Sequence, residues 1–332
     1  VDKCVPLITK QITDLAAAIS AIDIPLSEDA KEEELILAAG DFINDDQSFV
    51  KKLKALYAAK IYAKLATEEN PFKTFDEDTK DEVEATIPVS FLIQNPNFYT
   101  TAIVPAGKTS AEAKTTDFPG WTIDVLQGYI SPVFNTSWGG QKAASDVEPY
   151  VDCAVCTDWG TREYDVKQLI DMLPVAKYKA SIIVGEDGGD PHGAYAYLGE
   201  GEAQVKSEYT GNEEGSYSRD NSTPQVFENI TPTINGNFGE ITLGAHMMVT
   251  AGFGKVDTAT LEMVGKAEGF DYKAAAKQLA TSIDKTVATP AGAPINVQYF
   301  GIDGKQTLNP QGVTIKVETW ANGFVKISKV RM

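Results

Sequence analysis

The stretch "YKASIIV", residues 178–184, shows the pattern that decides the fold. Its apolar side chains fall on every second position, as in a strand with one face turned to a core. The same alternation returns at Ile241, Leu243, Ala245, Met247 and Val249, and again at Ala259, Leu261 and Met263. Clusters of Gly, Pro, Asn and Asp separate these runs, and no helical pattern lies between them. Short strands of this kind predict an antiparallel β-sandwich over residues 85–268.

The segment before the sandwich has helical periodicity. Apolar residues recur at spacings of three and four, which places them on one face of a helix. The stripes are Ile8, Ile12, Leu15, Ile19 and Ile22, then Leu35, Ala38, Ala39 and Phe42, then Val50, Leu53, Tyr57, Ile61 and Leu65. These stripes predict an N-terminal helical bundle over residues 1–68. Residues 69–84 contain many acidic side chains and a proline, which predicts a solvated linker.

The segment after the sandwich combines one helix with a small sheet. Residues 269–290 return to helical spacing and end in "TPAGAP", which predicts a helix followed by a linker. Residues 291–332 contain three strand patterns, with Asp303-Gly304 and Asn322-Gly323 as hairpin turns. The tail is therefore expected to form a three-stranded β-meander.

Charge and composition exclude several classes of function. The chain has 332 residues, a net charge of −18 and 43% hydrophobic residues. Its hydrophobic content is sufficient for packed cores, whereas its acidity argues against nucleic acid and anionic membrane surfaces as partners. No apolar run reaches the roughly 18–20 residues of a transmembrane helix. The chain begins at Val1, which is the pattern expected after removal of a signal peptide.

Two cysteines, Cys153 and Cys156, have C-x-x-C spacing. Their flanks resemble strand or loop, whereas a redox motif normally opens a helix after a strand. A zinc site needs two further Cys or His ligands nearby, and the surrounding sequence has none. Two interpretations stay open: small residues near a strand end, or a local disulfide.

The middle segment resembles a β-sandwich that is common in secreted proteins of gut Bacteroidetes. The resemblance rests on "NPNF" at Asn95–Phe98, "PGWTI" at Pro119–Ile123, "YDVKQLIDMLPVAKYKASIIVG" at Tyr164–Gly185 and "GEITLG" at Gly239–Gly244. These segments occur in the expected order over about half of the chain. The resemblance implies a galactose-binding-like jelly roll, the fold of many carbohydrate-binding modules. The expected fold class is thus multi-domain α plus all-β, with a helical bundle, a jelly-roll sandwich and a small C-terminal sheet.

The tail resembles a C-terminal segment of proteins from the same bacteria. It reads "VQYFGIDGKQTLNPQGVTIKVETWANGFVKISKVRM" and is similar in pattern to sorting-type tails. Lys305 stands where that pattern usually has arginine, and the last hairpin is longer, so cleavage of the tail stays open. The resemblance implies a secreted, periplasmic or cell-surface location.

Trp121 has two possible roles. It follows the Pro119-Gly120 turn and begins an alternating strand. A tryptophan next to such a strand buries a large apolar area, and in the resembling domains it packs between the sheets. We therefore expect Trp121 in the core and not at a ligand.

Two other tryptophans have the surroundings of a sugar site. Trp138 and Trp159 lie in polar, Gly-flanked stretches, and Asp158 and Arg162 adjoin Trp159. An aromatic ring can stack on the C–H groups of a sugar, while charged groups bond its hydroxyls. The sequence thus predicts a ligand face of Trp138, Asp158, Trp159 and Arg162. The alternative is that Trp159 is buried and Arg162 pairs with an acid such as Glu163.

The acidic stretch "GEDGGDPHG", residues 185–193, joins two predicted strands. Glu186, Asp187 and Asp190 offer the oxygen ligands that calcium prefers, although EF-hand spacing is missing. A solvated hairpin loop without metal is the simpler interpretation, and no other cofactor is expected.

These observations favour a non-catalytic carbohydrate-binding protein of the cell envelope or extracellular space, with a glycan or polysaccharide as partner. The chain has two histidines, and neither lies in a nucleophile elbow or a similar catalytic context. A structural or adhesive surface protein is the first alternative. A glycoside hydrolase is the second, since chance carboxylate pairs are inevitable in so acidic a chain. The sequence leaves the glycan and the oligomeric state open.

Overall fold

The computed structural model describes residues 5–24, 47–99, 116–134, 153–156, 160–187, 193–208, 223–287, 296–300, 306–307, 313–319 and 325–331. The chain divides into two compact units, Val1–Thr281 and Ser282–Met332. The finer division expected from the sequence, with boundaries after residues 68, 84, 268 and 290, stays a prediction. The first unit carries the N-terminal helices and the sandwich.

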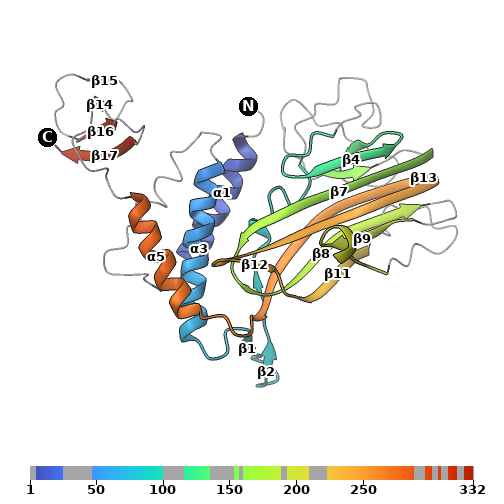
Figure 1. Cartoon of the computed structure of the whole chain (residues 1–332), viewed down its shortest axis with the longest axis horizontal. Helices are drawn as coiled ribbons and strands as arrows, with labels where there is room; N and C mark the ends of the chain where they lie inside the picture. Colours follow the sequence, from blue (N-terminus) through green and yellow to red (C-terminus); the bar gives the residue numbers. More distant parts are fainter. Residues whose placement is uncertain are drawn as a thin grey trace. The chain divides into compact units, whose positions relative to one another are not determined.

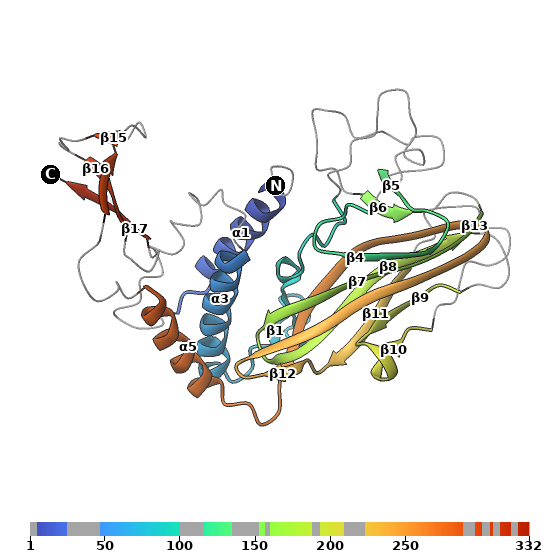
Figure 2. The same cartoon turned by 45° about the horizontal axis from the view of Figure 1, so that its top comes forward.

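Two N-terminal helices, α1 (Val5–Ser20) and α3 (Gln47–Thr67), lie side by side (Figures 1 and 2). Most positions of their apolar stripes are buried as predicted, at Ile12, Leu15 and Ile19 of α1 and at Val50, Leu53, Tyr57, Ile61 and Leu65 of α3. Ile22 lies after the end of α1 and is only half-buried. The stripe at residues 35–42 lies outside the described residues. The N-terminal helical bundle as a whole is therefore not confirmed.

The acidic stretch after α3 contains a short hairpin. It forms a hairpin of β1 (Lys73–Phe75) and β2 (Glu82–Glu84), with Lys73 opposite Glu84 and Phe75 opposite Glu82. All of these strand residues are exposed, and Lys73 Nζ lies 2.8 Å from Glu82 Oε2. Both strands are solvated, as expected, while Phe72 just before them is buried. The role of residues 69–84 as a linker stays a prediction.

The sandwich consists of two antiparallel sheets. Sheet I has the order β10-β9-β13-β7-β4, and β12 also pairs with β13. Its strands are β4 (Thr122–Gln127), β7 (Gly160–Leu173), β9 (Tyr195–Leu198), β10 (Val205–Lys206), β12 (Thr233–Asn235) and β13 (Phe238–Lys266).

Sheet II contains β11-β8-β13-β6-β5, and β3 also pairs with β13. Its other strands are β3 (Ile87–Pro88), β5 (Ser131–Phe134), β6 (Cys153–Cys156), β8 (Ala176–Asp187) and β11 (Thr223–Ile230). The expected β-sandwich is thus observed, beside helices.

Strand β13 belongs to both sheets (Figure 1). Its first part, Gly239–Gly252, pairs with β7, and its second part, Phe253–Lys266, pairs with β8. The two alternating runs that the sequence separates are therefore one continuous strand. Gly254 lies just after the change of partner, where a Cβ would come within 2.5 Å of Met247 Cγ. Glycine therefore permits the close approach at this point.

The core contains the side chains that alternation selects. Tyr178, Ala180, Ile182 and Val184 of β8 are fully buried, which confirms the prediction from "YKASIIV". Their counterparts on the other strands are Tyr164, Val166 and Ile170 of β7, and Leu243, Ala245, Met247, Val256, Leu261 and Met263 of β13.

Helix α3 is attached directly to the sandwich through Tyr62. The Tyr62 hydroxyl accepts the Val175 N–H at 2.7 Å and donates to the Asn237 carbonyl at 2.6 Å. Its ring lies 5.7 Å from the ring of Tyr272, at the start of α5 (Tyr272–Val287). The helices therefore share a core with the sheets and fix the surfaces between them.

The second unit contains the C-terminal sheet. Strands β14 (Asn296–Phe300), β15 (Gln306–Thr307), β16 (Val313–Thr319) and β17 (Val325–Arg331) have the order β15-β14-β16-β17 and pair antiparallel. The three predicted strands are present, and the short β15 is an addition.

Candidate functional site

Three sequence segments of the sandwich resemblance meet in one buried contact. The Trp121 indole N–H donates to the Asn95 carbonyl at 2.8 Å, and its ring stacks on Phe98 at 4.3 Å. Trp121 is 7% exposed, which confirms its predicted burial. Gln168 completes the contact, because its amide bonds both the N–H and the C=O of Gln94 and also the Gly120 carbonyl. The residues that carry the resemblance therefore form a loop junction.

Gly120 is required by the geometry of this junction. Its φ is +90°, in the region that glycine adopts most readily. A Cβ at this position would lie 2.9 Å from the Gln94 carbonyl oxygen. The glycine before Trp121 thus lets the turn approach the Gln94 backbone, where Gln168 binds both.

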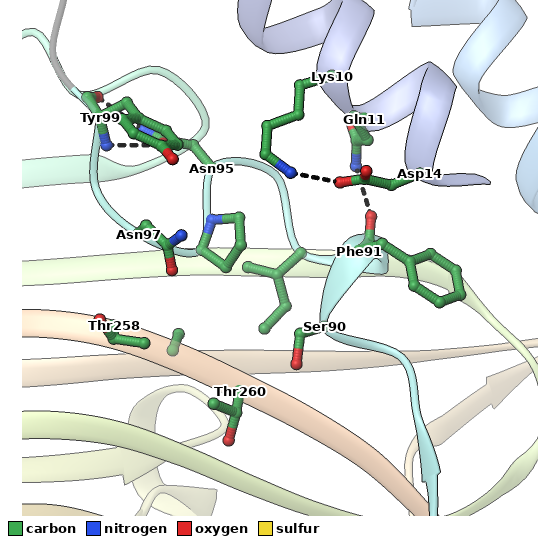
Figure 3. A pocket seen from close by; sticks show the side chains of 13 residues that line it. Lys10, Gln11, Asp14, Ser90, Phe91, Asn95, Asn97, Tyr99, Thr258 and Thr260 are labelled. Carbon is green, nitrogen blue, oxygen red and sulfur yellow. Dashed lines mark hydrogen bonds and ion pairs between the residues drawn. The ribbon is translucent and has the colours of Figure 1, made fainter. Parts of the chain in front are cut away.

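A hollow of about 240 Å³ lies beside this junction, between α1, residues 90–99 and β13 (Figure 3). Gln11 of α1 donates to the Phe91 carbonyl at 3.3 Å, and Lys10 pairs with Asp14 at 2.7 Å. Asn95 bonds the N–H and C=O of Tyr99. These polar groups already bond one another, so the residues that line the hollow mainly attach α1 to the sandwich.

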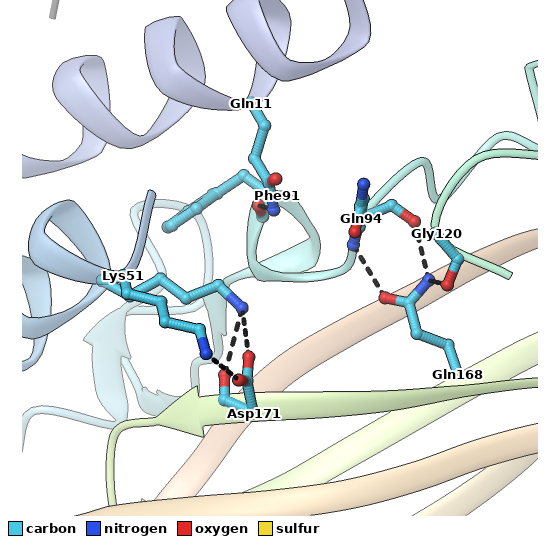
Figure 4. Close-up of polar contacts among 8 residues, drawn as sticks. Gln11, Lys51, Phe91, Gln94, Gly120, Gln168 and Asp171 are labelled. Atoms are coloured by element: carbon cyan, nitrogen blue, oxygen red, sulfur yellow. Dashed lines mark hydrogen bonds and ion pairs between the residues drawn. The ribbon is translucent and has the colours of Figure 1, made fainter. Parts of the chain in front are cut away.

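A second hollow, of about 210 Å³, lies on the other side of Gln11, between α3 and sheet I. We call it the Lys51 hollow; it is bordered by Lys51 and Lys54 of α3, by Asp171 of β7 and by the Gln168 junction (Figure 4). The Lys54 ammonium donates to the Asp171 carboxylate at 3.0 Å and to the Asp171 carbonyl at 3.1 Å. Lys51 Nζ lies 3.9 Å from the second carboxylate oxygen. Two cations thus share one carboxylate.

Burial dominates the chemistry of Lys54. Its side chain is 7% exposed, and this desolvation lowers its pKa, although Asp171 acts in the opposite direction. An ammonium in this position depends on its carboxylate, because an unpaired buried charge is costly.

We expect the two halves of this pair to respond differently to mutation. Asp171→Ala should lower the free energy of unfolding by about 2 kcal/mol, less than the loss for a fully buried pair because Asp171 is partly exposed. Lys54→Met should change it by less than about 1 kcal/mol, since it removes the desolvated charge and keeps the packing. Urea unfolding of both variants measures this difference. Equal losses in the two variants would contradict it.

The outer face of sheet I carries a row of polar and aromatic side chains. Strand register places Asp124 of β4 opposite Asp165 of β7, Asp165 opposite His246 of β13, and His246 opposite Tyr195 of β9. We call these four residues the His246 row. Inward-facing neighbours such as Val166 and Ala245 are buried, so the row lies on the face away from the core.

The centre of the His246 row is held by short contacts. His246 Nδ1 lies 3.1 Å from Asp165 Oδ1, and Nε2 lies 3.8 Å from Glu163 Oε1. The His246 ring stacks on Tyr195 at 4.9 Å, and the Lys206 ammonium lies 4.1 Å from the Tyr195 ring centroid. The side chains of His246 and Asp165 are 14% and 30% exposed, so solvent reaches both. The row therefore offers acceptors, donors and an aromatic ring to a ligand on this face.

Tyr197 lies beside the row on the same face of sheet I, with its ring 6.2 Å from the ring of Tyr195. A Cβ at Gly244 would lie 2.4 Å from the Tyr197 ring, so the glycine lets this ring lie close against the strand. Tyr197 is 3% exposed, and burial, followed by the charge of Asp165, raises its pKa. Its phenol therefore stays protonated and available as a donor beside the row.

The residues predicted to bind ligand are only partly described. Arg162 lies on β7, where Nη1 donates to the Thr161 carbonyl at 2.9 Å and the guanidinium carbon lies 4.6 Å from the Tyr129 ring centroid. Trp138, Asp158 and Trp159 lie outside the described residues, so their site with Arg162 stays a prediction.

The calcium prediction is also untested. Glu186 and Asp187 belong to β8, while their side chains and Asp190 lie outside what the structure describes. Within the described ranges, no three His, Cys, Asp or Glu side chains are grouped as metal ligands. In the same ranges, no helix has the length and apolar character to cross a membrane.

The sequence prediction missed the His246 row. Strand alternation does place Tyr195 and Tyr197 on one face of their strand, and His246 opposite to the core-facing Ala245 and Met247. The sequence alone could have shown this much. The row itself depends on the register of four strands whose residues are far apart in sequence.

No protein-family model and no curated protein matches this chain. Among solved structures, it is similar to the carbohydrate-binding module TmCBM61 in complex with β-1,4-galactotriose, with 18% identity, 43% of this chain and 88% of that chain covered, and a TM-score of 0.29. It is also similar to a structure of carbohydrate-binding modules from the β-sandwich superfamily, with 13% identity, coverage of 48% and 63%, and a TM-score of 0.27. A third is the enzymatically active domain of bacteriophage CBA120 tailspike protein 4, with 9% identity, coverage of 51% and 22%, and a TM-score of 0.29. Likeness at this level does not define the ligand of this chain.

Proposed function

We propose that this protein binds a neutral carbohydrate on the outer face of sheet I, without catalysis, at the cell envelope or outside the cell. The observation that carries the proposal is the His246 row, in which an aromatic ring, an imidazole and two carboxylates lie side by side across four strands. Such a combination suits a sugar, because the C–H groups of a sugar stack on aromatic rings and its hydroxyls form hydrogen bonds with planar polar groups.

The charges of this face favour a neutral ligand. Asp124, Asp165 and Glu163 add three carboxylates, against the ammonium groups of Lys167 and Lys206. An anionic ligand would meet net repulsion here, whereas hydroxyl groups can donate to each carboxylate. A sugar that stacks on Tyr195 takes the place of Lys206, whose exposed cation–π contact contributes only about 0.5–1 kcal/mol.

The arrangement of the carboxylates favours binding over hydrolysis. A glycosidase holds two carboxyl groups on either side of the scissile bond. Asp124 and Asp165 instead lie next to each other on paired strands of one sheet face. One stacked ring with one or two charged hydrogen bonds gives about 4–6 kcal/mol, a dissociation constant between millimolar and tens of micromolar.

We expect Tyr195→Ala to abolish retention of the protein on polysaccharide gels, because it removes the stacking ring and the support of His246. Asp165→Asn should weaken binding about tenfold or more, as expected when a hydrogen bond to a charged group is lost. Affinity electrophoresis against a panel of neutral polysaccharides measures both, and calorimetry with β-1,4-galactotriose, the ligand of one similar module, gives a first constant.

The matched control is Phe75→Ala, which removes an exposed aromatic ring from the β1–β2 hairpin. This variant should bind like the unaltered protein. Equal loss of retention in Tyr195→Ala and Phe75→Ala, or no retention of the unaltered protein, would overturn the proposal.

A further variant, Trp159→Ala, distinguishes the two candidate faces. Loss of retention in this variant alone would assign the ligand to Trp138, Asp158, Trp159 and Arg162.

A further inference from the structure

The Lys51 hollow has a charge opposite to that of the rest of the protein. Two ammonium groups, those of Lys51 and Lys54, lie at one carboxylate, that of Asp171, whereas the whole chain has a net charge of −18. One positive charge is therefore left over at this cavity. In so acidic a protein, a local excess of this sign concentrates anions at one place.

The two lysines differ in freedom. Lys54 is fixed, since its buried ammonium donates to the Oδ1 atom and to the backbone carbonyl of Asp171. The Lys51 side chain is 58% exposed, and its distance of 3.9 Å from Asp171 Oδ2 is longer than a hydrogen bond. Lys51 can turn from Asp171 to an anion in the hollow while Lys54 keeps the carboxylate occupied. Lys51 also lowers the pKa of Lys54, so an anion between them would relieve that repulsion.

The remaining walls combine polar groups with the apolar side chains of Val50 and Leu169. The Gln168 junction fixes Gln94 and Gly120 at one side, while Gln11 and Thr122 add an amide and a hydroxyl. The volume of about 210 Å³ is below the range of drug-sized sites, so the ligand has a single ring or is smaller.

We propose that the Lys51 hollow binds the carboxylate of a hexuronic acid, with Lys51 on the carboxylate and the amide and hydroxyl walls on the ring hydroxyls. This site is separate from the His246 row, whose carboxylates repel such a ligand. Either site can therefore fail without the other.

The test uses the full chain and three probes at equal ionic strength: sodium galacturonate, galactose and sodium phosphate. Calorimetry and amide NMR shifts should show galacturonate binding in the millimolar range, with galactose bound at least about tenfold more weakly at this site. Lys51→Gln should weaken galacturonate binding about tenfold or more, the effect of one lost hydrogen bond to a charged group.

Lys52→Gln is the matched control, because Lys52 is the next residue of α3, is exposed and carries the same charge, but does not line the hollow. It should leave the binding constant unchanged. Equal weakening by both variants would show a general charge effect and overturn the site. Equal affinity for galactose, or binding of phosphate but not of galacturonate, would overturn the assignment to a uronic acid.

Discussion

Replacing Trp121 with alanine is expected to lower the free energy of unfolding by about 3–5 kcal/mol, the loss typical of an emptied aromatic core position. The indole is nearly buried and stacks on Phe98 at an interplanar angle of 21°. Its loss also leaves the Asn95 carbonyl without the indole N–H that it now accepts. Both effects act at one loop junction, so the variant should lose the packing of residues 95–98 as well.

Urea unfolding followed by far-UV circular dichroism measures this loss without depending on indole fluorescence. Trp121→Phe keeps a ring beside Phe98 and removes only the N–H donor, so its loss should be about 1–3 kcal/mol. Leu126 lies on β4, which begins directly after Trp121, and is 56% exposed, so Leu126→Ala should change stability by no more than about 0.5 kcal/mol. An unchanged midpoint for Trp121→Ala would mean that the indole does not contribute to the core.

Local periodicity was sufficient to predict the core because burial follows the period of each element. On β8, Tyr178 and Ile182 point inward simply because a strand alternates, and on α3 the spacing of Leu53, Tyr57 and Ile61 gives one buried face. Such predictions of burial do not require knowing which side chain packs against which. The same reasoning placed Trp121 in the core but could not identify Asn95 as its partner, since this contact joins two loops 26 residues apart.

Contacts between distant strands were beyond this reasoning. The sequence shows that His246 faces outward, but only the register shows that Asp165 and Tyr195 are its neighbours. Register depends on long-range pairing, and a shift by one residue would turn each side chain to the other face. The continuity of β13 was missed for a similar reason, because glycines at residues 252 and 254 resemble a turn until both sheets are assembled.

The Lys51 hollow also depends on tertiary structure. Lys51 and Lys54 are ordinary helical lysines in the sequence, and Asp171 is one of many acids. Packing of α3 against the end of β7 brings them together and buries Lys54. The acidic composition argued against nucleic acid and anionic membranes as partners, but it could not show that two ammonium groups meet at Asp171.

Replacing Gln168 with methionine is expected to lower the free energy of unfolding by about 3–5 kcal/mol, because one buried side chain satisfies three backbone groups at about 1–3 kcal/mol each. Gln168 is 6% exposed; its Oε1 accepts the Gln94 N–H at 2.8 Å, and its Nε2 donates to the carbonyls of Gln94 and Gly120 at 2.8 and 2.9 Å. Methionine keeps the volume and removes every one of these bonds. Gln127→Met, the same exchange at an exposed position of β4, should be nearly neutral, and urea unfolding compares the two.

Gln168→Glu separates lost hydrogen bonds from lost packing. A carboxylate here would face the carbonyls of Gln94 and Gly120, which favour the protonated form and raise the pKa above the ordinary value of about 4.3. The folded state then binds more protons than the unfolded state, so stability falls as pH rises from the ordinary pKa through the raised one. The Glu variant should therefore approach the stability of the unaltered protein only in acid, while the Met variant stays equally destabilised relative to it at both pH values. If the Glu and Met variants lost the same stability at every pH, the three hydrogen bonds of Gln168 would not be what holds Gln94 and Gly120 together.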